Sequence, residues 1–310
     1  MLQNTQGAKV LYSCTNKSFV NAPAKVNLGL SLVGQTADGF HQLESLFWPI
    51  RLVDRIKLFQ SKIDSVETSW DNKVPWKDRE LPLPQDNLAY KALKGVPNNT
   101  RTPWKICIRK TIPIGGGLGG ASSDAAAVVR FFSCLNLLSQ HKGTALAKTL
   151  GADVPFFLSP KPAWVTGIGE KRRYLRIVPP DLKLHFLLVI PPFSINTREA
   201  FGWYRQKSPG FSEHKTFFMN GELNRENLLS YLASAKNDLE AVVGEKFPLI
   251  VQLIKKLREL PCVYAGLSGS GSTCFATFLD LHTLKKSAKE AEPFFRQYDC
   301  TSTTAGTYAE

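Results

Sequence analysis

Apolar residues recur at strand-like spacing through the first half of the chain. Residues 19–33 and 104–109 carry them at alternate positions, which predicts β-strands. Residues 43–59 form further apolar segments, and we expect Asp54 to interrupt them. Residues 122–135 contain neither Gly nor Pro and are apolar on most sides, which predicts a buried helix. The first half should therefore combine strands with at least one buried helix.

The rest of the chain continues this mixture of elements. Residues 60–86 are expected to form a loop-rich excursion and residues 87–94 a short helix. In the second half, residues 184–190 and 274–278 predict strands, and residues 248–260 place apolar and basic side chains at helical spacing. A chain of 310 residues that is 43% hydrophobic can bury a sizeable core and is long enough for two lobes.

The charge is strongly positive but dispersed. Lys and Arg number 39 against 26 Asp and Glu, a formal charge of +13. The basic residues stand in short runs, such as residues 171–173 and 285–286, without regularly interleaved aromatic residues. This pattern favours a solvated basic surface over a nucleic-acid surface. The longest apolar stretch, residues 184–193, is too short to span a bilayer. We therefore expect neither nucleic acid nor membrane as a partner, and the oligomeric state stays open.

The six cysteines are widely spaced, and no two form a C-x-x-C pair. In a chain of this length the spacing is typical of reduced thiols, which favours a cytoplasmic protein. The five histidines are equally scattered and give no local support for a zinc site. Residues 1–18 are polar and are expected to form a loose leader, and the question of an organellar address stays open.

A glycine-rich run stands between a predicted strand and a predicted helix. Five of the six positions 115–120 are glycine, which lets the backbone take positive φ values and approach a ligand closely. The helix that follows offers unpaired N–H groups and the positive end of its dipole, which suits phosphate. Ser122 and Ser123 can cap this helix, contact phosphate, or reach a Mg²⁺ ion that the phosphate holds.

Other interpretations of this run fit less well. It is not a Walker A loop, because no Gly-Lys-Ser/Thr closes it. A dinucleotide-binding loop needs an acidic residue about 20 positions further on, whereas no acidic residue lies between Asp124 and Asp153. A flexible turn rarely needs so many glycines. The run therefore predicts a phosphate-binding loop.

Three polar residues elsewhere are candidates with ordinary alternatives. Lys25 is a charged residue among strand formers, and on its own it favours the interpretation of a solvent-facing side chain. Asp153 lies between small and apolar residues, where an aspartate serves either a turn or a general base. His41 follows an aromatic residue after a turn, so the two together suit a planar base, although a lone histidine is more often structural.

Taken together, these segments resemble the GHMP kinases, the superfamily of galactokinase, homoserine kinase and mevalonate kinase. The similar segments follow the family's order along residues 19–280 and are Pro23 to Leu28, Gly34 to His41, Pro113 to Ser123, Gly151 to Pro155, Asn237 to Glu240 and Leu267 to Gly271. The glycine run alone would indicate only the superfamily. The turn at residues 38–41 and the segment at 151–155 point to the branch that acts on a cytidyl substrate.

The resemblance implies a role for each matching residue. Lys25 and Asp153 match the catalytic pair, in which Asp153 takes the proton of the acceptor hydroxyl and Lys25 keeps it ionised. The ATP-binding positions implied are Pro113, Gly115, Gly116, Gly117, Leu118, Gly119, Gly120, Ser122 and Ser123. The substrate-binding positions implied are Asn27, Phe40, His41, Thr197, Phe201, Gly269, Ser270 and Gly271, with Phe40 and Phe201 stacking on cytosine and His41 reading its edge.

The same resemblance implies a fold and a reaction. The fold is an α+β architecture with an ATP-binding lobe over residues 1–180 and a substrate lobe over residues 181–310. The reaction is transfer of the γ-phosphate of ATP to the 2-hydroxyl of 4-diphosphocytidyl-2-C-methyl-D-erythritol in the non-mevalonate route to isoprenoid precursors. ATP is the co-substrate and Mg²⁺ is held mainly by its phosphates, with no metal ligand assigned beyond Ser122 or Ser123. The alternatives are a mevalonate- or homoserine-type kinase, or a non-catalytic nucleotide-binding protein on the same fold.

Two positions depart from the usual pattern of this branch. Phe40 stands where tyrosine is frequent, which keeps stacking but removes a hydroxyl contact. Thr36 stands where a basic residue is frequent, which leaves the contacts of that turn undecided.

Overall fold

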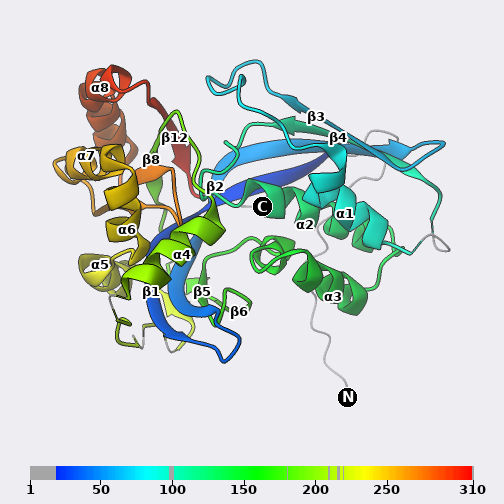
Figure 1. Ribbon diagram of the computed structural model, residues 1–310, viewed down its shortest axis with the longest axis horizontal. Helices are drawn as coiled ribbons and strands as arrows, with labels where there is room; N and C mark the ends of the chain where they lie inside the picture. Colours follow the sequence, from blue (N-terminus) through cyan, green and yellow to red (C-terminus); the bar gives the residue numbers. More distant parts are fainter. Residues whose placement is uncertain are drawn as a thin grey trace.

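Two β-sheets with helices packed against them build the protein (Figure 1). The structure is a computed structural model that describes residues 19–97, 101–179, 181–208, 210–214, 217–218 and 220–308. The predicted loose leader at residues 1–18 lies outside the described residues.

A long antiparallel hairpin of β1 (Phe19–Gln35) and β2 (His41–Gln60) organises the first sheet. The other strands of this sheet follow the order β3-β4-β2-β5-β6, with β1 paired to β2, and they are β3 (Ser65–Trp70), β4 (Trp104–Lys110), β5 (Ala163–Thr166) and β6 (Lys171–Tyr174). Strands β3 and β4 run parallel, and the other pairs are antiparallel. The alternating pattern that predicted a strand at residues 104–109 is confirmed.

One prediction for this region is wrong, and another omits a strand. Strand β2 does not break at Asp54, because the carboxylate of Asp54 is fully buried and forms an ion pair with Lys110 inside the protein. Residues 60–86 are loop-rich as predicted, but they also contain one strand that was not predicted, β3 at Ser65–Trp70. That strand lies at the sheet edge with every residue at least partly accessible, so its sequence is mostly polar and carries little apolar alternation.

Three helices lie on one side of the first sheet, as Figure 1 shows: α1 (Leu88–Gly95), α2 (Gly120–Cys134) and α3 (Gln140–Leu150). Helix α1 begins after Asn87, whose side-chain oxygen accepts a hydrogen bond from Ala89 N at 2.9 Å and so caps the helix. Helix α2 is buried along most of its length. The helices predicted at residues 87–94 and 122–135 are therefore confirmed.

The second sheet is antiparallel, with the order β10-β11-β8-β12. Its strands are β8 (His185–Ile190), β10 (Tyr264–Leu267), β11 (Cys274–Phe278) and β12 (Thr301–Gly306), and a short parallel pair, β7 (Arg176–Ile177) with β9 (Glu222–Leu223), stands apart. The helices of this half are α4 (Thr197–Lys207), α5 (Arg225–Ser234), α6 (Leu239–Lys246), α7 (Pro248–Arg258) and α8 (Leu281–Gln297). The predicted strands at 184–190 and 274–278 and the predicted helix at 248–260 are confirmed.

The hairpin passes through the middle of the molecule. Every residue of β1 from Ala22 to Leu32 is buried, so both faces of the strand are covered. Trp48 of β2 is also fully buried, and its Nε1–H donates to Thr307 Oγ1 at 3.1 Å, which joins the hairpin to the end of the second sheet. Polar residues on β1, Lys25 and Asn27 among them, therefore lie at the centre of the protein.

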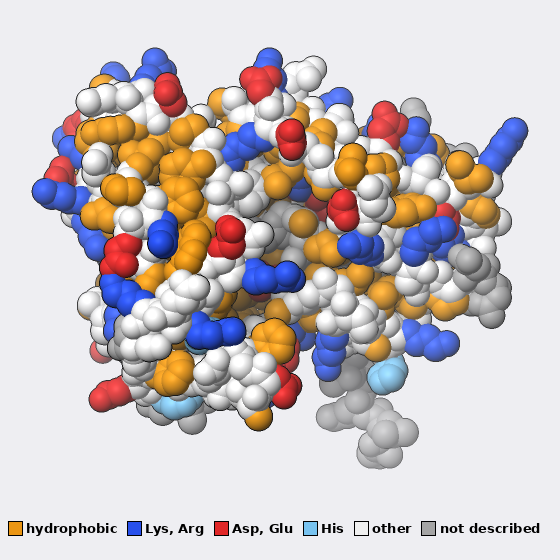
Figure 2. All heavy atoms as spheres, viewed as in Figure 1, with side chains coloured by type: hydrophobic (Ala, Val, Ile, Leu, Met, Phe, Trp, Pro, Cys, Tyr) orange, Lys and Arg blue, Asp and Glu red, His pale blue; other side chains and the backbone are white. Residues whose placement is uncertain are grey.

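The surface has a dispersed distribution of charge. Basic and acidic side chains alternate over the face drawn in Figure 2, without a single large basic patch there. Among the helices of the described ranges, none combines the length and the apolar character that a membrane span requires.

Candidate active site

A cleft of about 460 Å³ opens beside the glycine-rich run. Most of the predicted site residues line it: Lys25, Asn27, Pro113, Gly115, Gly116, Gly117, Leu118, Gly119, Gly120, Ser122, Asp153, Thr197, Phe201, Gly269 and Ser270. Four predicted residues stand outside the lining, namely Phe40, His41, Ser123 and Gly271. Segments that are more than 200 residues apart in sequence therefore meet in one cleft.

The glycine loop is held by its carbonyl groups. Gly115, Gly117 and Gly119 have φ values of +66°, +74° and +72°, a region in which a side chain is strained. The carbonyl of Gly117 accepts from Ser268 Oγ at 3.1 Å, and the carbonyl of Leu118 accepts from Lys25 N at 3.0 Å. Because these oxygens are engaged by protein donors, they do not present negative charge to a ligand in the cleft.

Helix α2 begins directly at the end of this loop. Its N-terminal cap, Gly119, has no side chain, so no cap group competes with a ligand for the N–H groups of the first turn. Ser122 lines the cleft, whereas Ser123 is fully buried within α2. The loop and the helix start together offer a row of N–H groups, which is an anion-binding arrangement.

Lys25 and Asp153 come together at one end of the glycine loop. Lys25 Nζ lies 3.6 Å from Asp153 Oδ2, and the lysine is only 4% exposed. Burial lowers the pKa of Lys25 from its usual value, and the charge of Asp153 counteracts this shift. The Asp153 side chain is about one-third exposed, so its carboxylate can reach a ligand in the cleft.

Asn27 links this pair to the strand beneath it. Its Oδ1 accepts a hydrogen bond from Lys25 Nζ, and its Nδ2 donates to Ser45 Oγ at 3.0 Å. Ser45 in turn donates to the carbonyl of Gly29 at 2.6 Å. Because Ser45 Oγ must donate to that carbonyl, it accepts from Asn27, and the Asn27 amide oxygen is left facing Lys25.

The second glycine loop, at residues 267–271, closes the same end of the cleft. Asn237 Nδ2 donates to the carbonyls of Leu267 at 2.9 Å and Gly269 at 2.7 Å, which fixes the loop. Ser270 Oγ lies 2.8 Å from Thr197 Oγ1 at the start of α4. Two hydroxyl groups that contact each other therefore line the same cleft as the Lys25–Asp153 pair.

A cluster of aromatic rings lies further along α4. His41 is 7% exposed, and its ring centroid lies 5.6 Å from that of Phe201 and 5.6 Å from that of Tyr204. Burial, with a smaller contribution from the charge of Arg205, lowers the pKa of His41 below its usual value. His41 is therefore a neutral ring at neutral pH.

Phe40 precedes this cluster on an exposed turn. It is 59% exposed, and its backbone N donates to Thr36 Oγ1 at 3.1 Å. Arg205 donates to the carbonyl of Gly39 at 3.0 Å, which connects the turn to α4. The hydroxyl of Thr36 thus closes the turn itself, which is a contact that the sequence did not predict.

Several other residues that line the cleft were missed by sequence reasoning. They include Thr68, Pro82, Asn87, Lys110 and Asp124. Asn87 had one signal, its position immediately before a predicted helix, but this signal indicates only a cap. Lys110 precedes the glycine run and Asp124 follows it. Asp124 had one signal in the sequence, because it is a carboxylate in a predicted helix that is otherwise mostly apolar.

Comparison with known proteins agrees with this geometry. Residues 87–161 match the family model "GHMP kinases N terminal domain", and residues 219–298 match "GHMP kinases C terminal". The 4-diphosphocytidyl-2-C-methyl-D-erythritol kinase of Syntrophotalea carbinolica is 35% identical over 283 residues, which cover 88% of this chain and 93% of the relative. That of Chlorobium phaeobacteroides is 35% identical over 286 residues, with 90% and 94% covered.

Solved structures give the same result. A crystal structure of 4-(cytidine 5'-diphospho)-2C-methyl-D-erythritol kinase aligns with a TM-score of 0.69 at 29% identity, covering 94% of this chain and 100% of the other. Homoserine kinase from Cytophaga hutchinsonii aligns with a TM-score of 0.64 at 16% identity, over 96% of each chain, which shows the fold alone. The fold and the site therefore define a GHMP kinase, and the predicted α+β fold of that class is confirmed. Within this class the chain belongs to the 4-diphosphocytidyl-2-C-methyl-D-erythritol kinase family.

Proposed function

We propose that the protein transfers the γ-phosphate of ATP to the 2-hydroxyl of 4-diphosphocytidyl-2-C-methyl-D-erythritol. The observation that carries the proposal is the Lys25–Asp153 pair, whose atoms lie 3.6 Å apart at the end of a glycine loop in one cleft. Phosphoryl transfer needs chiefly positioning and charge neutralisation, with a base beside the acceptor hydroxyl. The relatives named above, 35% identical over most of the chain, support the choice of substrate.

ATP is proposed to lie along the cleft with its phosphates on the glycine loop. The N–H groups of residues 115–120 and the start of α2 would hold the phosphates, and Ser122 would contact them from the first turn. Because the γ-phosphate must approach Asp153, the nucleoside would extend the other way, toward Thr68 and Asn87. Ser123 is proposed only as part of the helix start, since its side chain is fully buried.

Magnesium fits this arrangement as an ion that ATP carries into the site. Among the described residues, no group of three or more His, Cys, Asp or Glu side chains is placed to hold a metal ion. The ion would therefore be held by the phosphates, with the Ser122 hydroxyl as the available protein oxygen. When bound, it supplies charge neutralisation on the transferring phosphoryl group.

The acceptor hydroxyl is proposed to lie beside Asp153. The carboxylate accepts its proton as the oxygen attacks the γ-phosphorus, and the bond from that phosphorus to the bridging oxygen of ADP breaks. The Lys25 ammonium, held in place by Asn27 Oδ1, offsets the negative charge that gathers there. Gly269, Ser270 and Gly271 would close over the transferring group.

The cytidyl group is proposed to lie against α4. Phe201 lines the cleft, and Phe40 is exposed on the turn next to His41, whose ring centroid lies 5.6 Å from that of Phe201. We propose that the Phe40 and Phe201 rings hold the planar base between them. His41, neutral at neutral pH, would read the edge of the base, and Thr197 would bind the polar part of the substrate. Phe40 and His41 stand outside the lining of the cleft, so this end would be completed when the substrate binds.

The division of the chain at about residue 180 also belongs to the proposal. The strands of the first sheet end at Tyr174, and those of the second begin at His185. We assign ATP binding mainly to residues 1–180 and the substrate side mainly to residues 181–310, with β1 contributing Lys25 and Asn27 to both.

The decisive experiment is a coupled ADP-release assay on the purified protein and its Asp153→Asn variant. We expect turnover with the cytidyl substrate, and a fall in kcat of about 10³-fold or more in the variant with little change in KM for ATP. Asp181→Asn, a change of the same chemistry at an exposed carboxylate, is the control and should keep normal kcat. Turnover with mevalonate or homoserine instead would contradict the substrate, and a normal kcat in Asp153→Asn would contradict the role of Asp153.

A further inference from the structure

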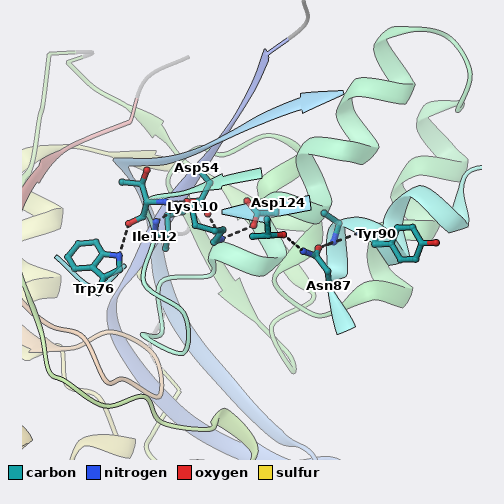
Figure 3. A network of polar contacts seen from close by, with 10 residues as sticks. Asp54, Trp76, Asn87, Tyr90, Lys110, Ile112 and Asp124 are labelled. Atoms are coloured by element: carbon teal, nitrogen blue, oxygen red, sulfur yellow. Dashed lines mark hydrogen bonds and ion pairs between the residues drawn. The ribbon is translucent and has the colours of Figure 1, made fainter. Parts of the chain in front are cut away.

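Three charged side chains form a buried ionic cluster behind the glycine loop (Figure 3). They are Asp54 of β2, Lys110 of β4 and Asp124 of α2, and none is more than 4% exposed. Lys110 Nζ lies 2.7 Å from Asp124 Oδ2 and also donates to Asp54 Oδ2. Figure 3 shows the lysine between the two carboxylates.

The charges in this cluster are mutually dependent. Burial opposes the charge of Lys110, but Asp124 and Asp54 outweigh it and hold the pKa of Lys110 above its usual value. Burial raises the pKa of Asp124. Removing one member of such a cluster leaves an uncompensated charge in a dry environment, which is strongly unfavourable.

The cluster connects both ends of the glycine loop to the sheet. Lys110 is the last residue of the strand that enters the loop, and Asp124 lies in the helix that leaves it. The other oxygen of Asp54, Oδ1, accepts from the backbone N–H groups of Thr111 and Ile112, the two residues before Pro113. One side chain of β2 thus fixes the entry to the loop, and through Lys110 it also fixes the exit.

The cluster also borders the cleft itself. Lys110 and Asp124 are lining residues, and Asp124 Oδ1 has no hydrogen-bond partner within the described ranges. A Cβ atom at Gly120 would lie 3.3 Å from Lys110 Nζ, so the cluster packs directly beneath the loop backbone. A displacement of these side chains would therefore move the N–H groups that face the cleft.

We propose that Asp54, Lys110 and Asp124 are positioning residues for the nucleotide, which hold the glycine loop in its phosphate-binding shape before ATP arrives. This inference rests on the proposed placement of the phosphates on that loop. Fixed N–H groups need no reorganisation when they meet a charged ligand, so the cluster acts on the affinity for ATP. It has no direct contact with the position proposed for the cytidyl substrate.

A second buried ion pair, at the opposite end of β4 from Lys110, provides a matched control. Asp64 forms a bidentate ion pair with Arg101 at 2.7 and 2.8 Å, and it accepts from the backbone N of Trp104 at 3.0 Å. The Asp64 and Arg101 side chains are 8% and 1% exposed. As in the cluster, a carboxylate with little exposure pairs with a cationic side chain and accepts a hydrogen bond from a backbone N–H group. Unlike Lys110 and Asp124, however, neither Asp64 nor Arg101 lines the cleft.

The experiment compares Asp54→Asn with Asp64→Asn in the full-length protein. Both variants should lose thermal stability, because each loses a buried ion pair. Only Asp54→Asn should raise KM for ATP, by about tenfold or more, while KM for the cytidyl substrate changes less than about twofold. Asp124→Ala should also raise KM for ATP by about tenfold, and Asp124→Asn, which keeps an oxygen for Lys110, should recover most of the loss.

The outcomes separate the possible explanations. Unchanged KM for ATP in both Asp54→Asn and Asp124→Ala, or an equal rise in Asp64→Asn, would overturn the inference and leave the cluster a purely structural feature. If Asp54→Asn does not fold, the Asp124→Ala and Asp124→Asn pair carries the test alone. Gly117→Ala distinguishes the inference from the proposed function. A normal KM for ATP in Gly117→Ala would contradict the proposal that the glycine loop binds the phosphates. If Gly117→Ala loses ATP binding while the Asp54 and Asp124 variants keep it, only the inference about the cluster is overturned.

Discussion

The two ends of the cleft are built in opposite ways. At the end proposed for the phosphates, the proposed contacts are backbone N–H groups, and the loop that carries them is held by Ser268, Lys25 and the buried cluster around Lys110. At the end proposed for the cytidyl base, the proposed contacts are side chains on α4 and on the turn before β2. Phe40 there is 59% exposed, and the hydroxyl of Thr36 and the side chain of Arg205 hold its turn.

This difference matches the physics of the two ligand parts. A phosphate oxygen needs N–H groups at hydrogen-bonding distance, and the interaction weakens steeply when the geometry changes. An aromatic base stacks on a ring over a range of offsets, so the rings need less exact placement. Substitutions at the phosphate end should therefore abolish most of the activity, whereas substitutions at the end proposed for the cytidyl base should lower the affinity for the substrate by degrees.

The largest effect is expected at Gly117. A Cβ atom there would lie 2.0 Å from the carbonyl oxygen of Ser268, and the φ value of +74° adds strain. Gly117→Ala must therefore displace one glycine loop or the other, and we expect kcat/KM to fall by about 100-fold or more. Gly306→Ala is the control, because, apart from its chain neighbours, no heavy atom of the described residues lies within 4 Å of the added carbon. Steady-state kinetics checks both, and a loss of less than threefold in Gly117→Ala would contradict the rigid phosphate end.

An intermediate effect is expected at Phe201. Loss of one stacking ring costs about 1–3 kcal/mol per base, so Phe201→Ala should raise KM for the cytidyl substrate by about tenfold or more. KM for ATP should stay within about twofold of normal. Phe59→Ala, which removes an exposed phenylalanine of β2, controls for the loss of an aromatic surface. Equal changes in the two KM values would show that the ends of the cleft are not independent.

The smallest effect concerns pH at the base end. The pKa of His41 is lowered in the folded protein from the usual 6.5, so below pH 6.5 the unfolded chain binds more protons. The stability contributed by neutral His41 is therefore present above pH 6.5 and is lost as pH falls toward the folded pKa. We expect a lower Tm at about pH 5.5 than at about pH 7.5, with a smaller difference in His41→Gln. His282→Gln, at an exposed histidine, should leave the difference unchanged, and an unchanged difference in His41→Gln would refute the assignment.

The regular elements could be predicted where one face of the pattern is buried. Residues 104–109 and 248–260 were predicted from apolar spacing, because burial of one side sets that spacing. Residues 122–135 were predicted from the absence of Gly and Pro and from apolar side chains on most sides, because this helix is buried along most of its length. Asp54 was misjudged for the opposite reason. A charged residue inside an apolar segment normally ends it, but here the compensating Lys110 lies 56 residues away in sequence. Such a partner cannot be identified from the local pattern.

The site was predictable in two unequal parts. The glycine run alone predicts a phosphate loop, because positive φ values and a close approach of the backbone to a ligand favour glycine. Lys25 and Asp153 carry no such local signal, and they were singled out together only through the resemblance to a family. Asn87 and Lys110, which also line the cleft, were missed, since a cap residue and a strand-end lysine are common in any protein. Three-dimensional proximity alone distinguishes them.

The contacts between the two glycine loops limit how the gene can be recombined. Ser268 Oγ donates to the carbonyl of Gly117, and the backbone N of Thr273 donates to the carbonyl of Gly116 at 3.2 Å. A chimera that takes its second half from another family member keeps the nucleotide grip only if that half supplies a hydroxyl and a free N–H at these two positions. A crossover point in α8 (Leu281–Gln297) lies after Ser268 and Thr273 and so keeps both contacts within one parent, whereas a crossover in α7 or between the two sheets separates them. Hybrids that exchange the chain from α8 onward should therefore be active more often.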